Sequence, residues 1–424
     1  MGLQGVTITK GKVGATASAI EAAISGLIAN GVAVAGKLVL ATHYTLYSVE
    51  DAAAIGIDAA YDTTNKVLVF HHISEFYRMA GAGTELHIMV VDQAILPGAI
   101  LDDTGNIYAR KLLSSAEGKI RQLAIAFNPE DDYTETTTDG INSDIRAAIA
   151  KAQAFAEWAY DMERPLQVFL EGRAFSGNAT TAINLKQLEV SAGVALEADK
   201  VSVVIGQDYN FADALTWALG KKYASVGLLL GTVAGIDINQ SIGEVETLNL
   251  TDAAKGLYTV GGLSSHAKVT DVEASLATLD TKGYILAGLY TGRCGYRWNW
   301  GHVCAPEKVD SEGHLNESTI EYGRTLDGAI RRLRTALLPK VKTQQPVDPS
   351  SGKLPMAVVK YFQGIGDGVF SDMAGEGLIS GGATTVDPDS NLHTGERALL
   401  VDFVAVPTGT IRAIKGSINL KIKF

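Results

Sequence analysis

The sequence predicts an α/β protein with a mostly parallel sheet. Between residues 37 and 234, short apolar runs typical of buried strands alternate with longer segments in which apolar residues recur at helical spacing. Strands that alternate with long helices form βαβ units, in which the strands run parallel. The expected strands are Leu38–Thr42, Leu86–Val91, Gln122–Phe127, Leu166–Leu170 and Val201–Ile205.

Helices are expected around these strands. Ala15–Asn30 places Ile24 and Ile28 on one side and is followed by glycine, so we predict an amphipathic helix there. Ser48 begins the next helix as its N-cap, because Asp51 follows three residues later. The remaining helices of this part are expected over Lys66–Ala80, Ser143–Tyr160, a segment near Ile183–Gly193, and Ala212–Ala234.

The last part of the chain has a different character. From Gly256 onward, glycine-rich turns accompany an aromatic and cysteine-bearing strand region, 284–304. Ser318–Leu338 is the strongest helix here and is followed by a proline that ends it. Gln344–Pro355 contains three prolines and is expected as a surface loop, and the residues beyond it are rich in strand formers.

Both ends of the chain carry short strands outside the compact elements. The last eight residues, 417–424, alternate between apolar and polar side chains, as a half-buried strand requires. Leu399–Val406 is almost continuously apolar, which favours a strand covered on both faces. Such strands complete their own sheet or add to the sheet of another copy, and we expect the second. The strand residues are Val6, Thr7, Ile8 and Thr9 at the start and Ile418, Leu420, Ile422 and Phe424 at the end.

Length and charge limit the function. At 424 residues the chain is expected to divide into two or three domains. The net charge of -11 argues against a nucleic-acid partner, because neutralising phosphates needs a basic surface. The sequence shows no apolar run as long as a membrane span, no signal-peptide pattern at its start, and too few cysteines for a disulfide framework. We therefore expect a cytoplasmic protein without direct membrane insertion.

The residue patterns do not predict catalysis. Gly364–Gly368 resembles half of a phosphate-binding loop but lacks the strand, helix and acidic residue of that motif, so a turn is expected. Cys294 and Cys304 bracket a histidine without a zinc spacing and are expected as buried thiols. His71 and His72 are expected on a helix surface, and the serines do not fall in a G-x-S-x-G elbow. We predict no catalytic residue, cofactor or metal, and no enzymatic activity.

The Ser318–Leu338 helix carries a local concentration of positive charge. Arg331, Arg332 and Arg334 lie within four residues. In an acidic protein such a cluster favours contact with an acidic partner surface. Cations at the end of a helix also complement the negative end of its dipole in solvent. Both interpretations stay open.

The order of these segments resembles that of the contractile tail sheath proteins of phages and phage-like contractile injection systems. KLVLATHYTLYSVEDAAAIGI (37–57) is similar to the family's apolar strand, serine-initiated turn and helix, and ISEFYRMAGAGTELHIMVV (73–91) to the helix, aromatic pair, glycines and strand that follow. Further similar segments are 224–245, 283–306, the arginine-bearing helix 318–338, 381–391 and 396–422. This chain departs from the family in having Pro407–Thr410 where a P-A-E-type motif is usual.

The resemblance implies a structural subunit that polymerises helically around an inner tail tube and contracts to drive the tube through a target envelope. It implies an N-terminal strand arm (1–14), an outer α/β region (15–305), and an inner α+β domain (306–424) completed by the N-terminal arm. The arms, including the terminal strand from about 416, would insert into the sheets of neighbouring copies.

The resemblance also implies partners and a location. The partners would be further copies of the chain, the inner tube protein, and baseplate and terminal cap proteins. We further predict that Arg331, Arg332 and Arg334 face the tube in the extended state. The subunit would be assembled in the bacterial cytoplasm into a virion tail or injection particle. The alternatives are another phage-type lattice protein, such as a tube or capsid subunit, and a nucleotide-binding α/β enzyme.

Overall fold

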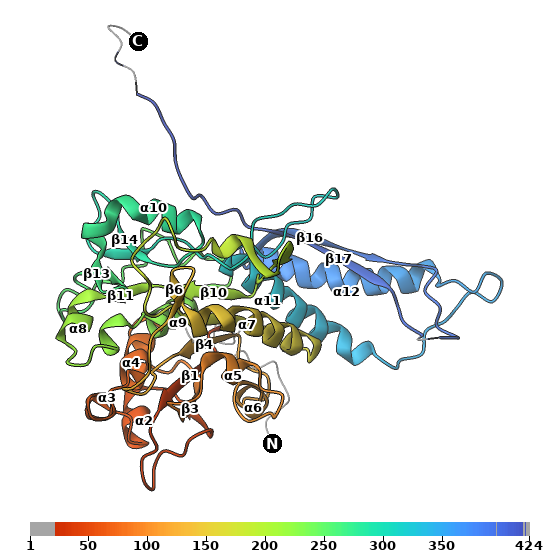
Figure 1. Ribbon diagram of the computed structural model, residues 1–424. Coiled ribbons are helices and arrows are strands. Elements are labelled where there is room, and N and C mark those ends of the chain that lie inside the picture. Colours follow the sequence, from red (N-terminus) through yellow and green to blue (C-terminus); the bar gives the residue numbers. More distant parts are fainter. Residues whose placement is uncertain (1–21, 396, 419, 421–424) are drawn as a thin grey trace, which may run out of the picture.

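The computed structural model describes residues 22–395, 397–418 and 420 (Figure 1). The predicted N-terminal strand, Val6, Thr7, Ile8 and Thr9, and the terminal residues Ile422 and Phe424 lie outside the described residues.

The largest sheet of the described chain has six strands in the order β10-β7-β4-β1-β3-β2. Only the edge strand β2 is antiparallel to its neighbour, β3. The prediction of an α/β protein with a mostly parallel sheet is confirmed. The strands are β1 (Ser25–Gly31), β2 (His43–Leu46), β3 (Leu86–Asp92), β4 (Gln122–Ala126), β7 (Gln167–Glu171) and β10 (Val201–Val204).

Helices cover both faces of this sheet, because each crossover between parallel strands must bury the apolar stripe of its helix. Helices α4 (Val69–Ala80) and α9 (Val226–Ala234) pack on one face, and α6 (Ala109–Ser115) and α7 (Ser143–Asp161) pack on the other. A Cβ added to Gly231 of α9 would lie 2.4 Å from the Phe76 carbonyl oxygen of α4, so these helices touch at backbone distance. Shorter helices complete the layers: α2 (Val49–Ala54), α3 (Ala59–Asn65) and α5 (Pro97–Leu101).

Small antiparallel sheets follow in the middle of the chain. Strands β11 (Gly206–Asp208), β12 (Gly261–Leu263) and β13 (Ala267–Lys268) form one sheet, and β14 (Ala287–Leu289) pairs with β15 (Tyr296–Trp298). Two hairpins and two helices accompany them: β5 (Thr137–Thr138) with β6 (Ile141–Asn142), β8 (Leu188–Ser191) with β9 (Val194–Leu196), α8 (Tyr209–Ala214) and α10 (Glu273–Thr281). We refer to residues 22–319 as the body.

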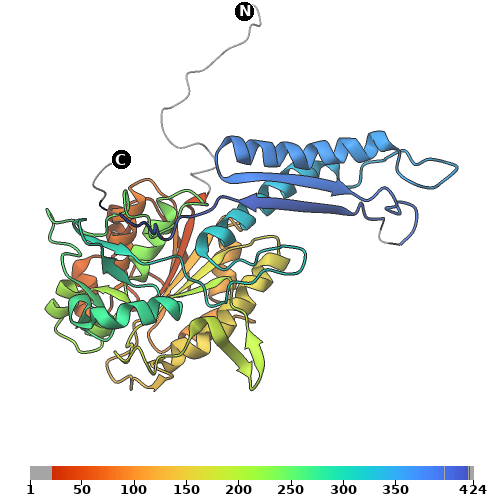
Figure 2. The ribbon, with the colours of Figure 1, turned by 90° about the horizontal axis from the view of Figure 1, so that it is seen from above.

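The remaining elements project from the body as an elongated unit (Figure 2). Helix α11 (Ile320–Leu337) leaves the body, and α12 (Met356–Gly375) lies along the hairpin of β16 (Ile379–Val386) and β17 (Val401–Pro407). We call residues 320–407 the C-terminal unit and residues 408–424 the C-terminal arm. Two apolar clusters lie in the unit: one includes Phe370 and also Ile238 of the body, and the other is formed by the unit alone.

Several sequence-based predictions are wrong. The second half of the predicted helix Ala15–Asn30 forms the central strand β1. All seven residues of β1 are buried, so the isoleucine spacing does not correspond to a helix with one buried and one exposed face. The segment near Ile183–Gly193 contains the β8–β9 hairpin instead of a helix. The predicted strand Leu38–Thr42 is a turn region, and the strand follows it as β2. The predicted helix Ala212–Ala234 is interrupted between α8 and α9.

The helices of the described residues do not combine the length and apolarity that crossing a bilayer requires.

Candidate assembly interface

The C-terminal hairpin is covered on one face only. Strands β16 and β17 pair with each other, with Gly382 opposite Ala405, and within the described residues neither strand has a second partner. Helix α12 packs on one face, where Phe370 approaches Phe403 with ring centroids 6.3 Å apart. A Cβ on Gly382 would lie 2.5 Å from the Phe370 ring, so glycine is required for this contact.

The other face of the hairpin is exposed and partly apolar. Val404 and Val406 of β17 are 49% and 54% exposed. The prediction that Leu399–Val406 is covered on both faces is therefore wrong for the single chain. A two-stranded sheet is marginal by itself, and free strand edges act as templates for further pairing. The hairpin thus presents unpaired backbone and apolar side chains together.

A groove borders β17 on the side of α11. Its volume is about 310 Å³, and it is lined by residues 403–407, by Tyr322 and Leu326 of α11, and by the loop 313–317. Leu315 and Leu326, on the wall facing β17, are 46% and 41% exposed. An added strand would lie about 4.8 Å from β17, and this groove offers apolar side chains beside that position.

Helix α11 is fixed to the body by a buried charge cluster. Lys200, at the start of β10, contacts Glu317, and its Nζ lies 2.7 Å from Asp327 Oδ1 of α11. Burial disfavours the charge on Lys200, but the two carboxylates outweigh it and raise the pKa of Lys200 to about 12. Burial also raises the pKa of Glu317 above its ordinary value. The C-terminal unit is therefore held by charges that are costly to separate.

Arginines extend this junction along α11. The guanidinium of Arg324 donates hydrogen bonds of 3.0 and 3.2 Å to the carbonyls of Asp237 and Ile236 after α9. Arg331 donates to the Pro165 carbonyl before β7. Together with the lysine cluster, these bonds tie successive turns of α11 to the body.

The predicted tube-facing arginines all have contacts within the chain. Arg331 reaches the body, Arg332 pairs with Glu376 at 2.7 Å, and Arg334 pairs with Glu163 at 3.0 Å. Arg334 keeps 44% of its side chain exposed, whereas Arg332 keeps 22%. Their role toward a tube stays a prediction.

Polar groups at the carboxyl ends of the parallel strands bind backbone atoms. This edge is where α/β proteins usually bind ligands. Glu171 at the end of β7 accepts hydrogen bonds from the backbone nitrogens of Phe127 (2.6 Å) and Ala224 (3.0 Å), and burial raises its pKa to about 7. Arg173 donates to the carbonyls of Phe127 and Leu219. The sequence analysis did not predict these roles of Glu171 and Arg173. The sequence signal for them is that polar residues directly follow an apolar strand.

Three smaller predictions are corrected. His72 is buried, and His71 stacks on Phe211 with ring centroids 3.7 Å apart, so the histidine pair does not lie on a helix surface. Cys304 is buried as expected, but Cys294 is exposed. The expected turn Gly364–Gly368 lies within α12. Within the described parts of the chain, His, Cys, Asp and Glu residues do not gather into a group of three able to hold a metal ion.

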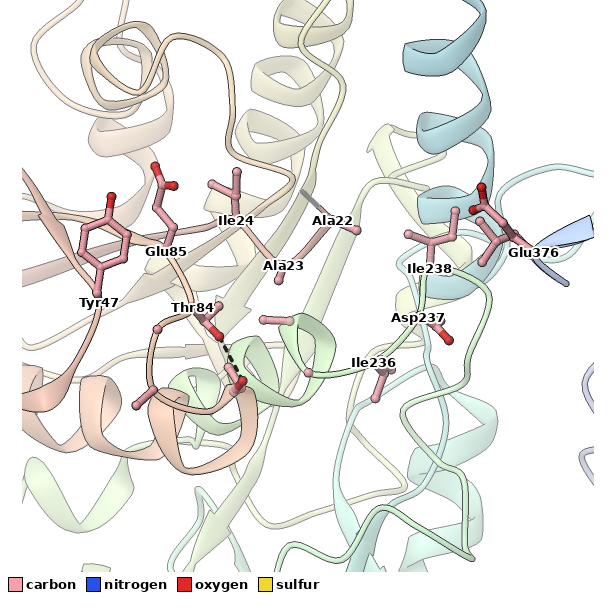
Figure 3. Close-up of a pocket in the computed structure, with 16 residues that line it drawn as sticks. Ala22, Ala23, Ile24, Tyr47, Thr84, Glu85, Ile236, Asp237, Ile238 and Glu376 are labelled. Atoms are coloured by element: carbon pink, nitrogen blue, oxygen red, sulfur yellow. Dashed lines mark hydrogen bonds between the residues drawn. The ribbon is translucent and has the colours of Figure 1, made fainter. Parts of the chain in front are cut away.

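The described chain begins in a groove between the body and the C-terminal unit. The groove has a volume of about 880 Å³, and Figure 3 shows Thr84 and Glu85 on one side and Ile238 and Glu376 on the other. Ala22 lines it and also packs against the apolar cluster of the C-terminal unit. Ala22, the first described residue, therefore lies where the two parts of the protein meet.

At the other end, the C-terminal arm leaves β17 without forming a strand in its described residues. Asn239 of the body donates a 3.0 Å hydrogen bond to the Thr408 hydroxyl. Ile418 and Leu420, part of the predicted terminal strand, are 94% and 100% exposed. Whether they pair with another copy stays a prediction.

These features define an α/β protein that carries a projecting C-terminal unit with an open-edged hairpin. A comparison with known protein families finds a match: the model of the N-terminal domain of the DUF2586 family matches residues 5–302. The chain belongs to the DUF2586 family. A comparison with curated proteins finds no match.

Solved structures of contractile systems share the fold. The chain matches a chain of the anti-feeding prophage helical sheath in its contracted state, with a TM-score of 0.55, 13% identity and 99% of both chains covered. It matches a chain of the anti-feeding prophage baseplate with a TM-score of 0.60, 13% identity and 100% of both chains covered. The sheath tail protein from Desulfitobacterium hafniense matches with a TM-score of 0.48 at 10% identity, over 95% of this chain and 100% of that chain. The predicted resemblance to contractile tail sheath proteins is confirmed at the level of the fold.

Proposed function

We propose that this chain is a structural subunit of a contractile sheath. It polymerises helically around an inner tail tube and contracts to drive the tube through a target envelope. The observation that carries the proposal is the hairpin of β16 and β17, which has free edges, an exposed apolar face and an apolar groove beside β17. The full-length likeness in fold to a contracted sheath supports the same reading.

The strand arms supply the connections between copies. Val6, Thr7, Ile8 and Thr9 at one end and Ile418, Leu420, Ile422 and Phe424 at the other add to the hairpins of neighbouring copies by main-chain pairing. The outer region (15–305) and the inner domain (306–424), completed by the N-terminal arm, then move together as one rigid body that stays connected to neighbouring copies during contraction. The buried charge cluster around Lys200 supports this, because it keeps α11 fixed on the body.

The other partners are the inner tube, the baseplate and a terminal cap. We assign the tube contact to Arg331, Arg332 and Arg334; the side chain of Arg334 is more exposed (44%) than that of Arg332 (22%). The subunit is assembled in the bacterial cytoplasm and works in a virion tail or injection particle, without enzymatic activity. The polar groups around Glu171 support a structural role, because they bind the backbone of adjoining loops.

Deleting residues 417–424 tests the proposal. The shortened chain should stay folded, with the thermal unfolding temperature of the full chain, because the described residues of this segment do not belong to its own sheets. It should form no tubes under conditions where the full chain does, as seen by negative-stain electron microscopy.

Two substitution variants control for the loss of length. Replacing Ile418, Leu420, Ile422 and Phe424 by serine should act like the deletion, whereas replacing Asn419 by serine on the other side of the strand should leave tubes intact. Normal tubes from the deletion variant would refute the proposed strand exchange.

A further inference from the structure

The base of the C-terminal arm is attached to its own body through one arginine. The guanidinium of Arg412 lies 2.6 Å from Asp280 Oδ2, at the end of α10, and 5.0 Å from the ring centre of Trp300. An ion pair and a cation–π contact thus hold the same side chain. Arginine suits this site because its planar group can stack and pair at once.

Asp280 is prepared for this contact by the body. Its other oxygen, Oδ1, lies 2.8 Å from Asn299 Nδ2 and 2.9 Å from His302 Nε2, so one carboxylate oxygen is fixed and the other faces the arm. Burial alone would raise the pKa of Asp280, but the hydrogen bond from His302 and the charge of Arg412 lower it. Asp280 is therefore ionised at neutral pH and oriented toward Arg412.

The surroundings match the charge of the arm. The groove beneath the arm has a volume of about 1150 Å³ and is lined by Asp280, Glu244 and Glu246 of the body, together with arm residues 408–414. The arm carries Arg412 and Lys415. Complementary charge therefore favours this path over the body.

On both sides of Arg412 the isoleucines of the arm are not covered by the body. Ile411, Ile414 and Ile418 are 79%, 89% and 94% exposed. A segment stored on the body until assembly would bury such side chains, since burying each would be favourable. The contact therefore holds the base of the arm and leaves its apolar residues available.

We propose that Arg412, held by Asp280 and Trp300, is a positioning residue that fixes the point from which the C-terminal arm reaches a neighbouring copy. The proposal rests on the strand exchange proposed above. From Pro407 the arm could extend about 56 Å over its 17 residues, whereas from Arg412 the remaining 12 residues extend about 40 Å. The anchor thus restricts which neighbour the arm can reach, and it raises the local concentration of the arm there.

A distance measurement on the unassembled protein tests the anchor. The exposed Cys294 takes one spin label and an introduced Ser417→Cys takes the other, since Cys304 is buried. Double electron–electron resonance should give a distance distribution that Arg412→Ala broadens, because the anchor limits where the arm can go. Lys415→Ala is the matched control, because Lys415 is exposed and forms no ion pair with the other described residues. An unchanged distribution in Arg412→Ala, or equal broadening in Lys415→Ala, would overturn the anchor.

Assembly tests the consequence separately. Arg412→Ala should raise the protein concentration needed for tube formation about tenfold, the effect expected for losing a partly exposed ion pair and a cation–π contact. The protein concentration that Arg412→Lys needs for tube formation should lie between those of the unsubstituted chain and of Arg412→Ala, since lysine keeps the charge without the planar stacking group. An unchanged threshold in Arg412→Ala would refute the positioning role. If the unsubstituted chain formed no tubes, the proposed sheath function would fail, while the resonance experiment would still decide the anchor.

Discussion

Replacing Lys200 by methionine should loosen the junction between the body and the C-terminal unit. Methionine matches the length of the lysine stem but leaves Glu317 and Asp327 facing each other without a cation. Removing one partner of a buried ion pair costs about 3–5 kcal/mol, because the remaining charge is buried without compensation. We expect a loss near 4 kcal/mol at pH 8, because the carboxyl group of Glu317 then has to ionise without its cation.

The loss should shrink at lower pH. Burial already raises the pKa of Glu317, and removing the lysine raises it further. A carboxylate whose folded pKa lies above its unfolded pKa contributes stability at low pH, and this contribution is lost as pH rises through the folded pKa. At pH 5 the carboxyl group of Glu317 is protonated and no longer leaves an uncompensated charge, so we expect a cost of about 2 kcal/mol.

Urea unfolding followed by tryptophan fluorescence at pH 5 and pH 8 measures both values. Lys308→Met is the matched control, because the ion pair of Lys308 with Glu197 is half exposed and such pairs contribute about 0.5 kcal/mol. A cost for Lys200→Met below about 1 kcal/mol at pH 8, or the same cost at both pH values, would refute the reasoning.

Three further predictions concern other parts of the fold. Burial first, and then the charge of His43, lower the pKa of His87 to about 4, so this neutral histidine contributes stability above pH 6.5 that is lost as pH falls toward 4. When the unfolding free energy is followed by acid titration, it should fall by about 2 kcal/mol, reduced from about 3 by solvent near the sheet edge. Replacing His87 by asparagine should remove this loss of stability. Gly231→Ala should lower the free energy of unfolding by more than about 2 kcal/mol, because the new methyl group forces α9 away from the backbone of α4. Gly364→Ala should raise the free energy of unfolding by about 1 kcal/mol, because Gly364 is exposed and has open space around it. Equal effects of the two substitutions in thermal unfolding would contradict this packing. Val406→Lys, on the open face of β17, should change stability by less than about 0.5 kcal/mol yet abolish tubes in electron microscopy, and tubes of normal length would count against that face as an interface.

The parallel sheet could be predicted because its strands are short, apolar and bounded by turns. Leu86–Val91, Gln122–Phe127 and Val201–Ile205 match β3, β4 and β10 within a residue or two. The amphipathic helix Ser318–Leu338 matches α11 for a similar reason, since its apolar face recurs with helical period. Elements with one buried face or with short uniform runs carry their structure in local sequence.

The central strand could not be recognised from periodicity. Every residue of β1 is buried, so neither an alternating nor a helical pattern of polar residues is present. The isoleucines of Ala15–Asn30 fell by chance at helical spacing. The glycines of Gly364–Gly368 led to the wrong prediction of a turn, because glycine is typical of turns. They lie within α12, which packs against β16 and tolerates them.

The candidate interface was predictable only in part. The sequence indicated strands at the end of the chain, but the apolar run Leu399–Val406 predicts cover on both faces, and the structure leaves one face open. Lys200 lies far from Glu317 and Asp327 in the sequence, and no local pattern shows that it meets them. Asp280 and Trp300 lie far from Arg412 in the sequence, so their contact with its side chain follows only from the fold.

Electron cryomicroscopy of the assembled protein, at a resolution that traces the main chain, tests the central claim most directly. We predict that backbone hydrogen bonds join the free edges of the β16–β17 hairpin to terminal strands of other copies. A map in which both ends of every chain fold back on the same chain, with no backbone pairing between copies, would contradict the account.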